Sequence, residues 1–131
     1  MLNSATPQRL SVRRSHRGGA EIVHIAGEVD VSTVDTLERD LLSAVATASP
    51  PSLIVLECSE VTFLGSCGIS LLLSVHHVAL AQDTPVRIVA PQRAVRRPVQ
   101  LIGYDRTLHL HDSLDEAVKR PVPAGSVPVR G

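Results

Sequence analysis

The sequence contains very few aromatic residues. Its 131 residues include one Phe, one Tyr and no Trp, so an apolar core has to be built from Leu, Ile, Val and Ala. Stacking of nucleic-acid bases or sugar rings needs aromatic faces, and the sequence is too poor in them for either role. Net charge is lacking too, because 13 basic and 13 acidic residues cancel. No overall field therefore attracts nucleic acid or an anionic membrane surface.

Cysteine and long apolar runs are scarce as well. Cys58 and Cys67 form no CxxC pattern and are too few for a disulfide framework, which favours a reducing, cytoplasmic location. The N-terminal ten residues hold no apolar segment of the signal-peptide kind, and no apolar run is long enough to span a membrane. The six histidines are scattered, without a Cys or carboxylate at ligand spacing, so we expect no metal site.

The sequence does show strand and helix patterns in alternation. Such an order is typical of an α/β domain with a mostly parallel sheet, which an opening β-hairpin at Gly18-Gly19 makes mixed. The predicted elements are strands around Leu10–Val12 and Ile22–Ile25, a helix after Ser32, a strand over 53–56, a helix over 69–81, a strand over 85–89, a helix over 93–102, a short strand at Leu108–Leu110 and a helix capped by Ser113 with Glu116.

Local patterns add detail to two of these segments. Ser32 is predicted to cap the first helix, with Asp35 in the capping-box position. A loop is expected after the strand over 53–56, with Phe63 and Leu64 as its apolar anchors. The buried stripe of the second helix is predicted to consist of Ile69, Leu72, Leu73, His76 and Leu80.

A single domain over residues 8–119 accounts for all of these elements. Residues 1–7 are expected to form a flexible N-terminus. Residues 120–131 hold three prolines and two glycines, which sustain neither a helix nor a central strand. We therefore expect a disordered tail there.

Two loops at the carboxyl ends of strands form the expected functional region. One is 27–30 and the other is 63–68, and they lie side by side if their strands are neighbours. Ser66 is at the start of the second helix, where free N–H groups and the helix dipole favour an anion. A phosphate on Ser66 would be accommodated there and would change the surface charge. The plainer interpretation is that Ser66 is simply a helix N-cap.

The ordered series of motifs is more specific than any one of them. It consists of Gly-Glu-Val-Asp at 27–30, a capped helix, a buried strand and Val-Thr-Phe-Leu-Gly-Ser-Cys-Gly-Ile at 61–69. This series resembles the STAS domain of bacterial anti-sigma factor antagonists. The segments 91–105 and 112–117 are similar too, so the resemblance runs from about Leu10 to Val118. It implies the STAS fold, a mixed and mostly parallel sheet of about five strands with about four helices.

The resemblance also implies a function in transcription regulation. In that family, an anti-sigma factor that is a serine kinase of the histidine-kinase-like ATPase type binds the antagonist, which frees the sigma factor. Phosphorylation of a serine at the start of the second helix makes the antagonist dissociate from the anti-sigma factor. By position that serine matches Ser66, and the acidic residue of the partner-contact region matches Asp30. The implied partner surface consists of Asp30, Ser32, Thr33, Gly65, Ser66, Cys67, Gly68 and Ile69.

Such an antagonist needs no chemistry of its own. The kinase would supply ATP and magnesium, so we expect no cofactor, no catalytic residue and no enzymatic activity in this chain. No direct contact with nucleic acid or membrane is implied. A weak homodimer is left open.

The sequence departs from the family pattern in three places. The usual Asp-Ser-Ser-Gly reads Gly65-Ser66-Cys67-Gly68, and Asp-Leu-Ser reads Glu57-Cys58-Ser59. Pro98 lies inside the third helix, where it is expected to kink or shorten that helix. Cys67 is a candidate redox-sensitive thiol beside a helix N-terminus, and Cys58, which flanks the same loop, is a second possible redox residue. The alternative for Cys67 is a small residue that merely replaces serine.

Two other functions stay open on the sequence alone. One is a STAS accessory subunit of a stressosome-like or lipid-transport-like complex that is not phosphorylated at this site. The other is a Ser or Cys enzyme, which needs a base within hydrogen-bond reach of Ser66 or Cys67. The G-x-S-x-G spacing of a nucleophile elbow fails, because Leu64 occupies its first Gly position. The low aromatic content favours an interface of polar loop groups and the exposed edge of the second helix.

Overall fold

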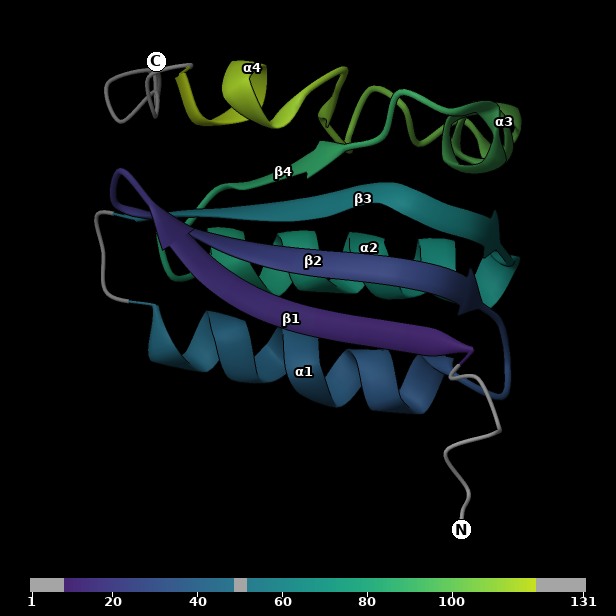
Figure 1. The fold of residues 1–131 in the computed structure, drawn as a ribbon, viewed down its shortest axis with the longest axis horizontal. Coiled ribbons are helices and arrows are strands. Elements are labelled where there is room, and N and C mark those ends of the chain that lie inside the picture. The colour runs from purple at the N-terminus through teal and green to yellow at the C-terminus, as the bar shows by residue number, and fades with distance from the viewer. Residues whose placement is uncertain (1–8, 49–51, 120–131) are drawn as a thin grey trace, which may run out of the picture.

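A computed structural model describes residues 9–48 and 52–119 (Figure 1). The flexible N-terminus predicted for 1–7 and the disordered tail predicted for 120–131 lie outside the described residues. The elements are β1 (Leu10–Arg17), β2 (Ala20–Val29), α1 (Val34–Thr47), β3 (Leu53–Leu64), α2 (Ser66–Leu80), β4 (Val86–Val89), α3 (Arg93–Ile102), β5 (Leu110–His111) and α4 (Leu114–Lys119).

The five strands form one mixed sheet in the order β1-β2-β3-β4-β5. β1 pairs antiparallel with β2, while the β2–β3, β3–β4 and β4–β5 pairs are parallel. The antiparallel pair is a hairpin whose two turn residues, Gly18 and Gly19, have φ angles of 57° and 84°. Two positive φ angles fit the type I′ turn that joins twisted strands, so the hairpin prediction is confirmed. The predicted α/β architecture with a mixed, mostly parallel sheet is confirmed as well.

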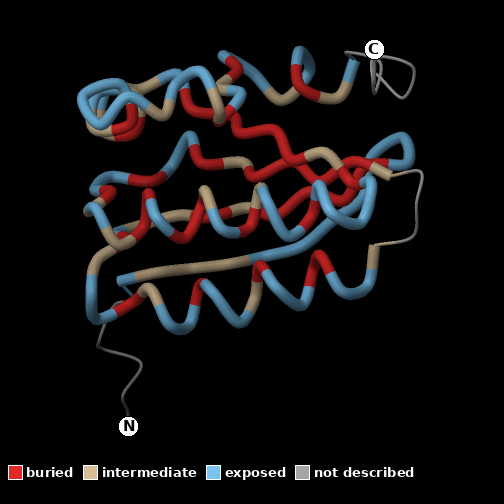
Figure 2. Tube along the Cα trace, turned by 180° about the vertical axis from the view of Figure 1, so that it is seen from behind, coloured by how far each residue is buried: buried red, intermediate tan, exposed pale blue. Residues whose placement is uncertain are grey.

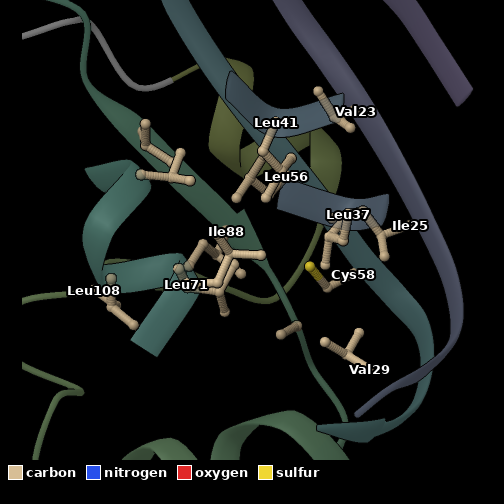
Figure 3. Close-up of a cluster of buried hydrophobic side chains, with 14 of the residues drawn as sticks. Val23, Ile25, Val29, Leu37, Leu41, Leu56, Cys58, Leu71, Ile88 and Leu108 are labelled. Atoms are coloured by element: carbon tan, nitrogen blue, oxygen red, sulfur yellow. The ribbon is translucent and has the colours of Figure 1, made fainter. Parts of the chain in front are cut away.

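The main core lies between the sheet and the first three helices (Figures 2 and 3). Side chains that alternate along β2 and β3, such as Val23, Ile25 and Leu56, pack there against α1, α2 and α3. A second, smaller cluster lies on the opposite face, where Ala117 of α4 packs against Ile22 of β2 and residues of β3 and β4. Both clusters are almost wholly aliphatic, as the aromatic-poor composition requires.

β3 has 12 residues, three times the length of the apolar run over 53–56. The strand continues to Leu64, so the loop expected after residue 56 is wrong. The apolar pattern is interrupted because the β2–β3 register shifts between Val61 and Phe63, which leaves Thr62 and Phe63 exposed while Val61 and Leu64 are buried. Leu64 is an apolar anchor as predicted. Phe63 is not, since 52% of its surface is exposed.

The buried face of α2 differs from the predicted stripe. Leu80 is 53% exposed and His76 is only half-buried, so both were wrongly placed in the core. The helix packs against α1 as well as against the sheet. Its buried arc is therefore rotated and wider than a single stripe. The buried residues of α2 are Gly68, Ile69, Leu71, Leu72, Val75 and Ala79.

The third helix runs through Pro98 without a break. α3 has the predicted bounds and ends at Gly103, whose N–H donates to the carbonyls of Val99 and Gln100. The expectation that Pro98 shortens this helix is therefore wrong. Val95 and Val99, one on each side of Pro98 in the sequence, are both buried against the core. This packing holds both halves of the helix in place although the proline lacks a backbone donor.

Candidate functional site

The two loops singled out in the sequence meet at one edge of the sheet. β2 and β3 are parallel neighbours, and Val29 pairs with Leu64 in the last register position. The Gly65 N–H then donates to the Val29 carbonyl oxygen at 2.9 Å. The prediction that the loops lie side by side is confirmed, because parallel neighbours end at the same edge.

Ser66 occupies the first turn of α2 and is exposed. Gly65 is the N-cap residue, and its carbonyl oxygen accepts hydrogen bonds from the N–H groups of Gly68 and Ile69 at 3.0 and 3.1 Å. No side chain caps this end of the helix, and its first turn holds no acidic residue. An anion next to Ser66 would therefore meet the positive end of an uncapped helix.

Asp30 lies in a network of hydrogen bonds at the end of β2. Its carboxylate accepts bonds from the Ser32 hydroxyl at 2.7 Å and the Ser32 N–H at 2.9 Å, and it pairs with the Arg9 guanidinium. The Ser32 hydrogen bonds, together with the positive charge of Arg9, lower the pKa of Asp30. The Asp30 carboxylate is therefore ionised at neutral pH.

Arg9 is the member of this network that the sequence analysis did not single out. Its guanidinium donates to the Glu28 carboxylate at 2.7 Å and to the Ser32 hydroxyl at 2.5 Å. The Glu28 hydrogen bond, followed by the charge of Asp30, raises the pKa of Arg9. Arg9 directly precedes β1, and the pairing of Leu10 with Gly27 brings it to this loop. Strand register was the missing information, because the contacting residues lie 19 to 23 positions apart.

Gly27 allows the backbone of Arg9 to come this close. Its φ angle is 110°, and a Cβ at this position would lie 2.0 Å from the Arg9 carbonyl oxygen. That oxygen accepts a hydrogen bond from the Glu28 N–H at 2.8 Å. A residue with a side chain would be strained in this conformation and would displace Arg9.

The start of α1 differs from the prediction. The helix begins at Val34 with Thr33 as the N-cap residue, so the prediction that Ser32 caps it is wrong. The Ser32 hydroxyl instead donates a hydrogen bond to the Asp30 carboxylate in the same turn. Thr33 is buried, and its hydroxyl donates to the Glu28 carbonyl oxygen at 2.8 Å. These bonds fix the path of the loop between β2 and α1.

The structure divides the predicted partner residues into two groups. Thr33, Gly68 and Ile69 are buried, and Ile69 is only 1% exposed. A Cβ on Gly68 would lie 2.6 Å from Val29 Cγ1 and 2.7 Å from Leu64 Cδ1. Gly68 and Ile69 therefore hold α2 against the strands from inside. The predicted partner residues with exposed or half-exposed surface are Asp30, Ser32, Gly65, Ser66 and Cys67.

The two cysteines lie in different environments, and both are free thiols. Cys58 points into the main core (Figure 3), where burial raises its pKa to about 12. Its thiol stays protonated at neutral pH and is closed to solvent, which argues against a redox role for Cys58. Cys67 is half-buried at the start of α2.

We expect native protein to take up iodoacetamide at Cys67 and not at Cys58. The Cys58 thiol is buried and protonated, whereas the Cys67 side chain reaches the surface. Intact-mass measurement should show one carbamidomethyl group on the native protein and two after unfolding in guanidinium chloride. The Cys67→Ser variant is the control and should stay unmodified until it unfolds. Rapid native labelling of that variant would contradict the placement of Cys58.

The site contains no arrangement for nucleophilic catalysis within the described ranges. Neither the Ser66 hydroxyl nor the Cys67 thiol has a hydrogen-bond partner among the residues of 9–48 and 52–119. A serine or cysteine nucleophile needs a base within hydrogen-bond reach. In the same part of the chain, no group of three or more His, Cys, Asp and Glu side chains is placed to hold a metal ion.

The family assignment rests on the whole length of the described domain. Residues 11–117 match the family described as the STAS domain. The chain belongs to the STAS domain family. This match covers every strand and helix of the structure except the ends of β1 and α4. The suspected resemblance is confirmed.

Named relatives of this STAS domain are anti-sigma factor antagonists. The anti-sigma-F factor antagonist RsfB of Mycobacterium tuberculosis is 31% identical over 114 residues, which are 87% of this chain and 91% of RsfB. The crystal structure of an anti-sigma factor antagonist from Mycobacterium paratuberculosis has a TM-score of 0.77 and 33% identity, and covers 86% of this chain and 94% of that chain. The unphosphorylated antagonist SpoIIAA shares the fold, with a TM-score of 0.69, 19% identity and coverage of 84% and 95%.

Within the described residues, this STAS domain has no helix with the length and apolar character needed to cross a bilayer.

Proposed function

We propose that this STAS domain is an anti-sigma factor antagonist that binds a kinase-type anti-sigma factor in the cytoplasm and is switched off by phosphorylation of Ser66. The observation that carries the proposal is the exposed Ser66 hydroxyl at an uncapped helix N-terminus, beside the Asp30 loop. RsfB, the relative that spans nearly the same length, is named an anti-sigma-F factor antagonist.

The electrostatics of the site explain how a phosphate at Ser66 would act as a switch. The group adds a charge of about −1.5 to −2 at neutral pH. The dipole of α2 stabilises that charge within the chain. Toward a partner, however, it joins the carboxylates of Glu28 and Asp30, which share the single Arg9 cation. A complementary surface that accepts the unmodified loop therefore loses affinity for the modified one.

The test is phosphate transfer measured as intact mass. The full chain is incubated with each kinase-type anti-sigma factor from the source genome, together with magnesium and ATP. We expect a gain of one phosphoryl group, abolished in Ser66→Ala. Ser70→Ala is the matched control, because Ser70 is the exposed serine one turn further along α2, and it should be modified like the wild type.

Each other result decides against a part of the proposal. A stable complex without mass gain would leave an antagonist whose control lies elsewhere than Ser66. Modification that persists in Ser66→Ala would place the site on another residue. With no complex and no modification, the antagonist function itself would be wrong.

A second candidate is an accessory STAS subunit that is not phosphorylated at this position. The observation in its favour is Gly65, because no carboxylate stands next to Ser66 where the family pattern has Asp. A pull-down from the source cells separates the two candidates. The antagonist should recover an ATP-binding kinase, and the accessory subunit should recover components of a larger assembly.

A further inference from the structure

Two exposed apolar side chains lie in the two segments that meet at the start of α2. Val31 is 83% exposed in the loop after β2, and Phe63 is 52% exposed near the end of β3. Phe63 is the only phenylalanine in an aromatic-poor chain. Burial would normally be expected for such a residue, so its exposure beside a candidate partner site is informative.

The position of Phe63 follows from the geometry of the strand. Leu64 and Val61 turn into the core, while Phe63 pairs with the exposed Glu28 on β2. Its ring then reaches Gly65. The atom Phe63 Cε2 lies 3.4 Å from the point where a Cβ of residue 65 would be. The aromatic ring is therefore in contact distance of the N-cap of α2, one residue from the Ser66 hydroxyl.

The surroundings of these two side chains are polar. The Arg9 guanidinium and the carboxylates of Glu28 and Asp30 form the ion network described above. An apolar centre with a polar rim is the usual anatomy of a protein interface, and aromatic residues supply a large share of its binding energy. An exposed aromatic ring offers no hydrogen-bond donor or positive charge to a phosphate or another small anion.

We infer that Phe63, supported by Val31, is the apolar anchor that inserts into a depression on the anti-sigma factor. The inference rests on the proposed function. A kinase that reaches the Ser66 oxygen has to cover the residues next to it, and the Phe63 ring is among them. The occupant of this surface is thus the partner that acts on Ser66, and its contact with Phe63 is apolar.

The same placement couples the anchor to the switch. In the complex, the ring and its apolar partner would exclude water from the neighbourhood of Ser66. A phosphate of charge about −1.5 to −2 would then have to lose part of its hydration there. The cost is absent in the free protein, where the phosphate stays in water at the open end of α2. Phosphorylation therefore weakens the contact next to Phe63 specifically.

The experiment compares the affinities of full-length variants for the kinase-type anti-sigma factor, by isothermal titration calorimetry without ATP. Phe63→Ala is expected to raise the Kd about tenfold or more, and Val31→Ala to raise it severalfold. Leu80→Ala is the matched control. Leu80 is 53% exposed, like Phe63 at 52%, but lies at the other end of α2, about 20 Å from Ser66. Its Kd should stay within about twofold of the wild type.

The outcomes separate this inference from the function on which it rests. Wild-type affinity in Phe63→Ala would overturn the inference and leave the antagonist function standing. An equal loss in Leu80→Ala would also overturn it, because the effect would not be located at the site. If the wild type binds no anti-sigma factor, both fail. A concentration-dependent dimer that only Phe63→Ala abolishes would make a second copy the occupant, against the inference. Melting temperatures near that of the wild type show that the variants are folded.

Discussion

Gly68→Ala is expected to lower the free energy of unfolding by up to about 2 kcal/mol. The added methyl group would lie 2.6 Å from Val29 Cγ1 and 2.7 Å from Leu64 Cδ1. Val29 is β-branched and only 1% exposed, so it has little freedom to move aside. Overpacking of this kind costs about 1–3 kcal/mol, while alanine in place of glycine in a helix gains about 1 kcal/mol. The steric cost exceeds the gain in helix propensity.

Urea denaturation measures this effect, and a second glycine supplies the control. Gly65→Ser adds a Cβ whose nearest neighbour is the ring of Phe63 at 3.4 Å, and it places a favoured residue at the N-cap of α2. We expect its stability to stay within about 0.5 kcal/mol of the wild type. A Gly68→Ala protein as stable as Gly65→Ser would show that α2 does not lie as close to β2 and β3 as described.

Ser66→Glu is expected to bind the anti-sigma factor at least about tenfold more weakly than the wild type. A carboxylate at this position adds a third negative charge to the surface that holds Asp30 and Glu28, so a partner surface complementary to the unmodified loop loses affinity for it. The folded state should not suffer, because an acidic residue in the first turn of α2 interacts favourably with the helix dipole. Surface plasmon resonance gives the Kd, and thermal unfolding gives the stability.

Ser74→Glu is the matched control for this charge. Ser74 is exposed on the same helix, about 12 Å along its axis from Ser66. The control adds the same charge to the protein, and we expect its Kd to stay within about threefold of the wild type. Wild-type affinity in Ser66→Glu would argue that charge at this position does not control the complex. Equal losses in both variants would point to net charge rather than to the site.

Helix positions and the general order of elements followed from local sequence patterns. The bounds of α3 were predicted to the residue, because apolar spacing and Gly103 are local signals. The predictions were wrong where tertiary contacts determine the end of a strand or the buried face of a helix. The second half of β3 is a strand because β2 pairs with it up to Leu64, although its mixture of polar and apolar residues is also typical of a loop. The buried face of α2 is set by α1 and the sheet together, which no single-helix pattern contains.

The candidate site was predicted in part. The resemblance pointed to Ser66 and Asp30, and the structure places the loops that carry them side by side. Arg9 was outside the predicted site because only the β1–β2 register brings it to Asp30. Phe63 was expected to be an apolar anchor inside the fold, and this was wrong. The sequence alone does not show to which side of a strand a residue points.

The sequence by itself determined the aliphatic core, the α/β class and the serine at the start of α2, because composition, hydrophobic period and helix signals act over a few residues. The tertiary structure decided what surrounds that serine. Strand register assembled the network of Arg9, Glu28 and Asp30 from distant positions, and the shift in the β2–β3 register between Val61 and Phe63 turned the Phe63 side chain outward. A one-residue change of register would reverse every side chain of a strand, so these neighbours depend on the packing of the whole sheet.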